Sequence, residues 1–397
     1  MMGKRKPALR FKGFEGEWET CRLGDIVQII MGQSPDGSTY SETPSDYILV
    51  QGNADLKNGW VTPRIWTTRA TKKASAGDLI MSVRAPAGTM GKTAYNVVLG
   101  RGVAAIKGNE FLYQNLVKMD SDGYWRKLSS GSTFESLNSN DIKNAELFVS
   151  SNTEQIRIGD FFQQLDALIT QQQRKYDSLL NVKKSMLEKM FPKDGADVPE
   201  IRFKGFEGKW RQRQFGDIVD SYQDPVPTPH NGYTRLGIRS HAKGTFHSYV
   251  EKGRELETAQ MHRVAAGNFI VNITFGWEHA VAITEGSDAG KLVSHRFPQF
   301  RFHDGLNPEF FKYVIIDEKF RHHLWLASPG GAGRNRVLKI NEMLEYKMAF
   351  PSEDEQEKIA IYFKHLDTLL TLHRQKLDHL NHIKSALLEK MFVSEAA

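Results

Sequence analysis

The chain has 397 residues, which is long enough for two or three domains. Its 40% hydrophobic and 25% charged residues are typical of a soluble globular protein and argue against a wholly disordered chain. A single cysteine excludes an intrachain disulfide and a cysteine-based zinc cluster, and the net charge of +6 favours an anionic partner such as nucleic acid.

Two further absences narrow the class of protein. No run of 18 or more uncharged apolar residues is present, so no transmembrane helix is expected. The first residues, MMGKRKPALRFKGFEGEW, lack the apolar stretch of a secretory signal. Together with the single cysteine, these features predict a cytoplasmic protein.

Taken in chain order, the predicted elements form two sets, each with short strands and a short helix followed by one long helix. Apolar, β-branched runs bounded by Gly, Pro, Asn and Asp turns predict strands at 47–50, 79–83, 97–106, 268–274 and 279–284. Short helices are predicted at 110–120 and 308–326. Two much longer helices are predicted at 154–191 and 355–392, each after a mixed α/β stretch.

The chain also repeats itself. RFKGFEG stands at residues 10–16 and again at 202–208, and GDIV stands at 24–27 and 216–219. The two long helices match each other and both end in LEKMF. Units of this length are too long for solenoid repeats, so the chain is a tandem duplication of a domain followed by a helix.

The middles of the two units, residues 28–150 and 220–350, share little. One interpretation is that loops simply drift after any duplication. The other is that the similar ends do one mechanical job, whereas the divergent middles do two different recognition jobs.

The long helices have a seven-residue apolar repeat. In the first it runs through Ile158, Leu165, Leu179 and Met186, and in the second through Ile359, Leu366, Leu380 and Leu387. Such a repeat keeps one seam facing a partner helix, as in a coiled coil. Both series have a polar residue at the centre, Gln172 and His373, which can fix the register. Each helix is about 57 Å long and should project from a small domain.

Motifs for catalysis are missing. Gly91-Lys92-Thr93 resembles the end of a P-loop, but Pro86 stands where that motif needs glycine, so a turn between strands is expected. The dinucleotide motif Gly-x-Gly-x-x-Gly and the amino-methyltransferase motif Asn/Asp-Pro-Pro-Tyr are absent. Nine of the thirteen histidines lie between His230 and His323 without a metal-ligand spacing. We therefore expect a non-catalytic chain with no metal site.

The divergent middles contain polar and basic residues, and these are the candidate DNA-binding residues. They are Gln33, Ser34, Arg64, Lys72, Lys73, Arg84, Ser130 and Ser132 in the first middle, and Arg235, Arg239, Lys243, Arg334, Asn335 and Arg336 in the second. Phosphate contacts are expected from Lys72, Lys73 and Arg336, and base-edge contacts from Gln33, Arg84, Arg239 and Arg334. Ser/Gly loops at 129–134 and 328–336 occupy comparable places before the two long helices.

Over nearly its whole length the sequence resembles the specificity (S, HsdS) subunit of type I restriction–modification systems. The resemblance rests on the duplication, the GDIV repeats and the paired helices with Glu-Gln, Leu-Asp and Leu-Glu-Lys-Met-Phe. The run GSTFESLNSNDI at 131–142 also resembles the family pattern. The second unit departs from it there, with Gly333-Arg334-Asn335-Arg336 followed by Ile340-Asn341.

This resemblance implies an α+β fold with two mixed α/β target recognition domains, each followed by a long helix, and the two helices pairing as an antiparallel coiled coil. The expected boundaries are 1–153 and 199–352 for the recognition domains, and 154–198 and 353–397 for the helical spacers. Each domain would read one half of a split, asymmetric site in double-stranded DNA.

The resemblance also implies partners. Two modification (methyltransferase) subunits would dock on the helices, and ATP-dependent restriction subunits would join through them. S-adenosylmethionine, ATP and Mg²⁺ are then expected on the partner subunits and not on this chain. Two alternatives remain open: a coiled-coil scaffold whose variable domains bind protein, and a self-contained nuclease or methyltransferase with an unrecognised site.

Overall fold

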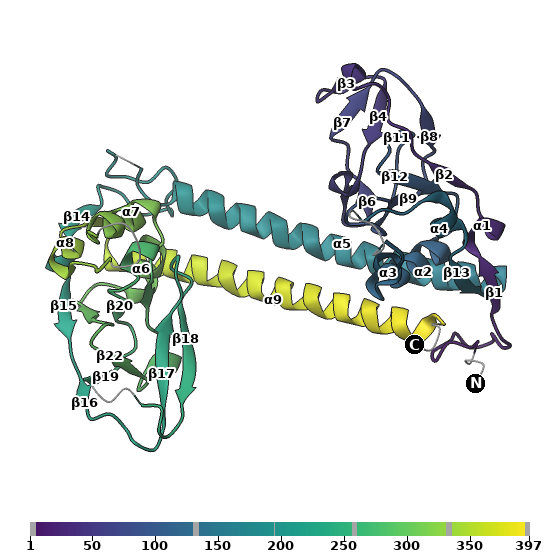
Figure 1. The fold of residues 1–397 in the computed structure, drawn as a ribbon. Helices are drawn as coiled ribbons and strands as arrows, with labels where there is room; N and C mark the ends of the chain where they lie inside the picture. Colours follow the sequence, from purple (N-terminus) through teal and green to yellow (C-terminus); the bar gives the residue numbers. More distant parts are fainter. Residues whose placement is uncertain (1–4, 130–134, 194, 256–259, 331–335, 394–397) are drawn as a thin grey trace. The chain divides into compact units, whose positions relative to one another are not determined.

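The computed structural model describes residues 5–129, 135–193, 195–255, 260–330 and 336–393 (Figure 1). The chain forms two compact units, the first from residues 1–176 and 372–397 and the second from residues 177–371. Two long helices, α5 (Asn152–Lys189) and α9 (Glu353–Met391), each contribute one part to either unit.

Two sheets and a strand pair form the first unit. The six-stranded sheet has the order β2 (Ile29–Met31), β12 (Val103–Ile106), β9 (Leu79–Ser82), β10 (Met90–Lys92), β6 (Trp60–Val61) and β5 (Leu56–Lys57). The five-stranded sheet has the order β3 (Tyr40–Ser41), β7 (Ile65–Thr67), β4 (Tyr47–Val50), β11 (Val97–Leu99) and β8 (Lys72–Ala74). The pair is β1 (Glu19–Arg22) with β13 (Glu146–Val149), and the helices are α1 (Leu23–Ile26), α2 (Glu110–Ser121), α3 (Tyr124–Ser129), α4 (Ser139–Lys143) and the first part of α5.

The six-stranded sheet is buried on both faces, which explains its unbroken apolar runs. In β9, Leu79 and Met81 pack into the core that contains α2. Ile80, between them, points into a second core shared with the five-stranded sheet. Because side chains alternate along a strand, two covered faces require apolar residues at every position.

The second unit has the same layers. Its first sheet has the order β15 (Val219–Tyr222), β23 (Gln299–Phe302), β20 (Phe269–Val271) and β21 (Val281–Ile283). Its second has the order β16 (Pro225–Val226), β19 (Met261–Arg263), β22 (Leu292–Ser294), β17 (Tyr233–Ile238) and β18 (Thr245–Val250). β14 (Arg211–Gln214) pairs with β24 (Lys347–Phe350), and the short helices are α6 (Pro308–Val314), α7 (Glu318–Leu326) and α8 (Ile340–Leu344).

The repeated RFKGFEG segment has the same role in both units. Arg10 donates to both carboxylate oxygens of Glu154 at 2.6 and 2.7 Å, and Arg202 does the same to Glu355 at the same two distances. Both glutamate side chains are 1% exposed. The segment therefore fastens the start of each unit to the beginning of a long helix by a buried, bidentate ion pair.

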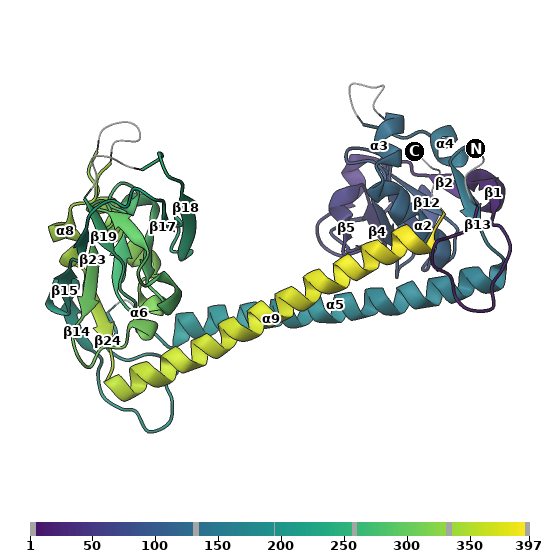
Figure 2. The same ribbon diagram turned by 90° about the horizontal axis from the view of Figure 1, so that it is seen from below.

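Each long helix has Met-Phe at its end. This end is buried in the unit that contains the start of the other long helix. In the first unit the end of α9 lies beside α2 (Figure 2). Phe392, just after α9, packs against Trp18, Phe111 and Phe162. In the second unit Phe191, just after α5, packs in the same way against one tryptophan and two phenylalanine rings. Each globular core is thus completed by a helix that belongs to the other repeat.

Polar contacts give the helix pairing a direction. In the first unit Lys384 Nζ lies 2.6 Å from Asp166 Oδ1, and Gln172 contacts His373, so that the predicted polar residues of the seam meet. In the second unit Lys183 pairs with Asp367. Partner numbers fall along α9 as they rise along α5, which makes the pairing antiparallel within each unit.

The predicted fold class is confirmed, with two corrections to single elements. Residues 97–106 were expected to form one strand but form β11 and β12, because Gly100-Arg101-Gly102 turns the chain between two different sheets. The single helix expected at 308–326 is divided into α6 and α7, because Asp317 caps a new helix by accepting from Lys319 N.

Candidate nucleic-acid interface

One edge of the five-stranded sheet of the first unit gathers many of the candidate residues. β4 and β11 are parallel to each other and antiparallel to their outer neighbours β7 and β8. The ends of the two central strands therefore meet the starts of the two outer ones. We call this place the first edge and define it as residues 32–34, 51–55, 64, 71–72, 83–84 and 99–102.

A tightly packed turn lies at the centre of the first edge. A Cβ on Gly32 would stand 2.0 Å from Gly100 O, and one on Gly102 would stand 2.1 Å from Gln51 O, so only glycine fits at both positions. Arg101 projects from this turn with an exposed side chain, and its N–H donates to Ser34 Oγ at 3.0 Å. The turn holds a cation on rigid backbone, as a nucleic-acid contact requires.

Gln33 and Arg64 flank this turn. Gln33 is exposed, and its N–H donates to Leu99 O at 2.8 Å. Arg64 Nε donates to Asp55 Oδ1 at 3.0 Å, yet its side chain is 53% exposed, whereas that of Asp55 is 1% exposed. The buried carboxylate therefore orients a guanidinium whose remaining N–H groups face solvent.

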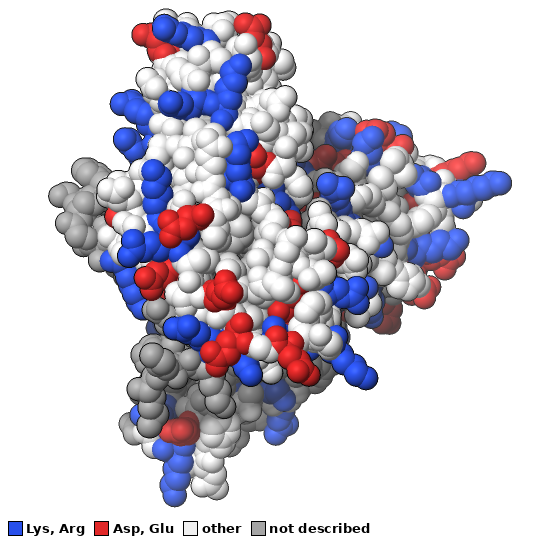
Figure 3. Space-filling view, turned by 90° about the vertical axis from the view of Figure 1, so that its right-hand side faces the viewer, with Lys and Arg blue, Asp and Glu red and all other residues white. Residues whose placement is uncertain are grey.

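The two neighbouring lysines point to opposite faces of the sheet. Lys72 shares the side of its strand with buried Ala74 and lies opposite Leu99, at the first edge. Lys73 lies on the other face, with Nζ 4.7 Å from the centre of the Tyr47 ring. Arg84 is exposed and forms a β-bridge with Ser136, next to the end of the Ser/Gly loop. Figure 3 shows Lys and Arg side chains following one another over the upper part of the face that it presents.

The second unit has a corresponding edge. β17 and β22 are parallel, and β18 and β19 flank them antiparallel. The second edge comprises residues 238–245, 272–279, 294–297 and 336–338. Arg239 lies with its guanidinium 5.2 Å from the centre of the Phe246 ring and donates to Thr245 O, and Lys243 is exposed in the β17–β18 turn. Arg235 is exposed on β17 and lines a hollow beside this edge.

Side-chain contacts fix the loops of the second edge. Ser240 Oγ donates to Glu278 Oε2 at 2.6 Å, and His241 N donates to Glu278 O at 2.9 Å. His279 adopts a left-handed backbone, and its Nε2 lies 2.7 Å from Ile315 O. Burial is the main cause that lowers the pKa of His279, which favours the neutral ring at neutral pH.

Arg336, a further predicted residue, ends the second Ser/Gly loop. The guanidinium of Arg336 lies 4.7 Å from the centre of the Trp325 ring, at the end of α7. Leu338 N then donates to Ile273 O, which returns the chain to the second edge. Ser130, Ser132, Arg334 and Asn335 lie outside the described residues.

Sequence reasoning missed two exposed cations, Arg101 and Arg296. Arg101 stands between two glycines, and that Gly-Arg-Gly pattern is the signal that was available. Arg296 comes shortly after β22, and its place at the second edge can be recognised only when the strand order is known. Lys92, the lysine of the segment that resembles a P-loop, lies in β10 and pairs with Glu110 at 2.8 Å, largely buried.

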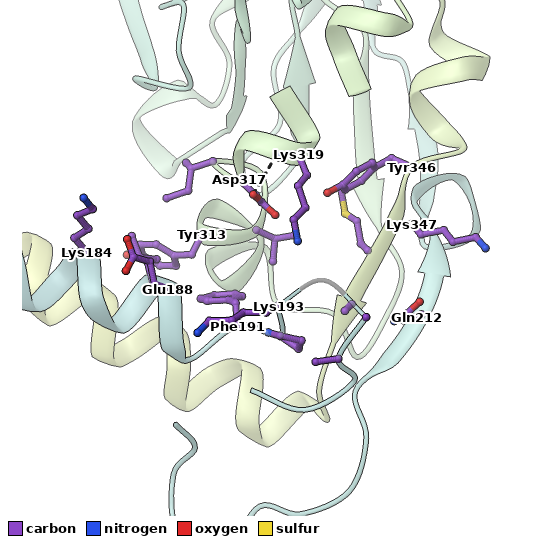
Figure 4. Close-up of a pocket in the computed structure, with 18 of the residues that line it drawn as sticks. Lys184, Glu188, Phe191, Lys193, Gln212, Tyr313, Asp317, Lys319, Tyr346 and Lys347 are labelled. Atoms are coloured by element: carbon purple, nitrogen blue, oxygen red, sulfur yellow. Dashed lines mark hydrogen bonds between the residues drawn. The ribbon is translucent and has the colours of Figure 1, made fainter. Parts of the chain in front are cut away.

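A larger hollow of 790 Å³ lies elsewhere in the second unit, between the end of α5, α6 and β24 (Figure 4). Phe191, Tyr313 and Met348 give it apolar walls, and Lys184 and Lys347 give it basic ones. Its walls combine the end of α5 and the linker after it with residues of the divergent middle, among them Tyr313 and Met348.

Among the described residues, no group of three or more His, Cys, Asp or Glu side chains is placed to hold a metal ion. Across the same part of the chain, no helix has the length and apolar character needed to cross a membrane.

Comparisons with known proteins relate the chain to one family. Residues 15–181 match the model of the type I restriction modification DNA specificity domain. Over 96% of its length the chain is 19% identical to the type I restriction enzyme MjaVIII specificity subunit of Methanocaldococcus jannaschii, and the match covers 93% of that protein. Residues 15–181 thus have the sequence pattern of a type I DNA specificity domain, and over nearly its whole length the chain is similar to specificity (HsdS) subunits.

Two further comparisons bear on the chain. It is 27% identical over 181 residues to the MjaX specificity subunit of the same organism, a match that spans 43% of this chain and 42% of that relative. The crystal structure of the type I S subunit from M. genitalium superposes with a TM-score of 0.66 at 14% identity and covers 98% of this chain and all of that one. The fold is therefore the same.

Proposed function

We propose that this chain is the specificity subunit of a type I restriction–modification system and recognises double-stranded DNA by sequence, with the first edge reading one half of a split site and the second edge reading the other. The observation that carries the proposal is the combination of one repeated frame with two different basic edges. Arg64, Arg84 and Arg101 supply the first edge with exposed cations, and Arg239 and Lys243 supply the second. Arginine pairs with guanine edges and phosphates, so different arrangements read different sequences.

The asymmetry of the site follows from the divergence of the middles. Two copies of one reader would give two equal half-sites, whereas residues 28–150 and 220–350 share little. We therefore expect two unrelated half-sites separated by bases that the protein does not read.

In this proposal the long helices set the gap between the half-sites. Each helix has 38 or 39 residues, which corresponds to about 57 Å, and one turn of DNA is about 34 Å. A matched heptad inserted into both helices adds about 10 Å. We expect such a variant to prefer a longer gap with unchanged half-sites, and an unchanged gap would contradict the role of the helices as a spacer.

The helices would also dock the modification subunits. Leu168 on α5 and Leu369 on α9 occupy the same position of the repeat and are 53% and 42% exposed. Apolar side chains exposed at equivalent places favour two equivalent binding surfaces, and hence two modification subunits. S-adenosylmethionine, ATP and Mg²⁺ chemistry would lie on the modification and restriction subunits.

The test is to map methylated positions in the host genome with and without this gene. The proposal predicts a split, asymmetric motif that disappears when the gene is deleted. The purified complex should bind that motif with strong salt dependence, because phosphate contacts release counterions. A genome in which no motif depends on the gene would favour the scaffold alternative, in which the variable domains bind protein.

A further inference from the structure

A hollow of 350 Å³ opens beside the second edge. Two of the aromatic side chains that line it, Phe246 and Phe275, are 39% and 44% exposed. The Phe246 ring lies across Gly237, where a Cβ would come within 2.3 Å of the ring, so glycine makes room for it. Arg239 stacks on the same ring. The hollow therefore offers flat apolar surfaces that are held in place before any ligand arrives.

Polar groups lie deeper in the hollow. Glu278 uses Oε2 to accept from Ser240, and Asn272 uses Oδ1 to accept from Thr274 N at 3.0 Å. Within the described part of the chain, Glu278 Oε1 and Asn272 Nδ2 take part in no hydrogen bond. One acceptor and one donor group are thus available beside the rings. Carboxylates accept from amino groups of bases, and amides pair with adenine, so this set complements the edge of a nucleobase.

The surroundings of the hollow carry positive charge. Arg235 lines it, and Arg239, Lys243 and Arg296 are exposed nearby on the second edge. Glu278 is the acidic residue among the described lining residues, and Ser240 donates to it. This charge distribution suits a ligand that is joined to a phosphate backbone, and it disfavours an apolar peptide or a second copy of this edge.

We propose that the hollow binds one nucleobase of the second half-site as a ring turned out of the DNA stack. The inference rests on the proposed function and adds a mode of reading to it. A base that stays paired presents only its edge to the protein. Phe246 and Phe275 instead offer surfaces on which the face of a base can stack, and half-buried Asn272 and Glu278 lie beside them. Extruded bases are held by aromatic stacking and by hydrogen bonds to their pairing edge.

The experiment uses the full chain assembled with its modification subunits and duplexes that carry the mapped motif. A mismatch is placed at each position of the second half-site by changing only the opposite base. A mismatch removes the cost of unpairing but keeps the base that is read. We expect a mismatch at one position to make binding about tenfold tighter. The fluorescence of a 2-aminopurine placed next to that position should increase.

Two variants connect this response to the hollow. Phe275→Ala should weaken binding of the intact motif by about 5- to 150-fold, the range of one lost base–aromatic stack, and should abolish the gain from the mismatch. Tyr249→Ala is the matched control, because Tyr249 is 65% exposed on the same strand as Phe246 but does not line the hollow. It should bind and respond like the parent chain, and equal melting temperatures establish that both variants fold.

The outcomes separate the inference from the proposed function. If the parent complex reads the second half-site but every mismatch weakens binding, the bases are read within the stacked duplex and the inference is wrong. The inference is equally wrong if Tyr249→Ala and Phe275→Ala have equal effects. If the parent complex shows no sequence preference in the second half-site, the proposed function itself fails.

Discussion

The two units share a frame but differ at the edges proposed to meet DNA. The frame repeats down to single bonds, because Arg10 with Glu154 and Arg202 with Glu355 have the same geometry. At the first edge a Gly-Arg-Gly turn is packed tightly against its neighbours, whereas the second edge is hollowed and lined by phenylalanine. After the duplication, the contacts that hold each domain to its helix stayed the same, whereas the edges proposed to recognise sequence diverged.

The largest expected effect concerns the shared frame. Glu355→Gln leaves Arg202 largely buried without its counter-charge and should lower the free energy of unfolding of the second unit by about 3 kcal/mol. Glu154→Gln should cost the first unit about the same, because the two ion pairs match. Urea unfolding followed by hydrogen exchange in each unit measures both losses. Glu357→Gln, exposed on the same helix, is the control, and a clear inequality between the two losses would break the comparison.

The next effect concerns the edges. Arg101→Ala should weaken binding of the motif by about 1–3 kcal/mol and relax positions in the first half-site only. Arg239→Ala should do the same in the second half-site. Binding measured on all single-base variants of the motif separates the two, with Arg213→Ala as a control, since Arg213 is exposed on β14 away from both edges. A loss that is equal on all sequences would instead identify a phosphate contact.

The smallest effect is a difference in acid stability. His279 is buried in the second unit with a lowered pKa, whereas the histidines of the first unit, His373, His379 and His382, are half-buried or exposed. Arg321 and His241 nearby oppose its protonation, and Glu318 favours it. Between the folded pKa and the unfolded value of about 6.5, the unfolded chain binds more protons, so stability rises with pH there. Lowering the pH through this window should therefore weaken the second unit more than the first.

His279→Asn tests the origin of that difference. Asparagine tolerates the left-handed backbone that this position requires, and it does not titrate. The pH dependence of hydrogen exchange in β20 and β21 should become flatter in the variant. An unchanged dependence would assign the acid sensitivity to other groups.

The sequence alone predicted those features that depend on local pattern. The seven-residue repeat and the duplicated LEKMF ends were enough for the long helices and for the polar residues Gln172 and His373 at the centre of their seams. The antiparallel pairing followed from the family resemblance, and the contact of Gln172 with His373 is seen only in the structure. The burial of Phe392 in the first unit was not predictable, because it depends on which helix end meets which core.

The candidate site was predictable only in part. Composition pointed to basic residues in the divergent middles, but not to their arrangement, which depends on strand order. Lys72 and Lys73 are adjacent in sequence yet point to opposite faces, and Arg101 reaches the first edge because β4 and β11 are parallel neighbours. The hollow at the second edge combines residues from several strands and loops, so no local sequence motif predicts it.

One measurement tests the central claim most directly. Residues 28–150 are replaced by the corresponding segment of a specificity subunit with another target, and methylated positions are mapped in cells that carry the hybrid. The account predicts that one half of the motif changes, while the other half and the gap stay as they were. A motif that changes in both halves, or in neither, would contradict the division of recognition between the two units.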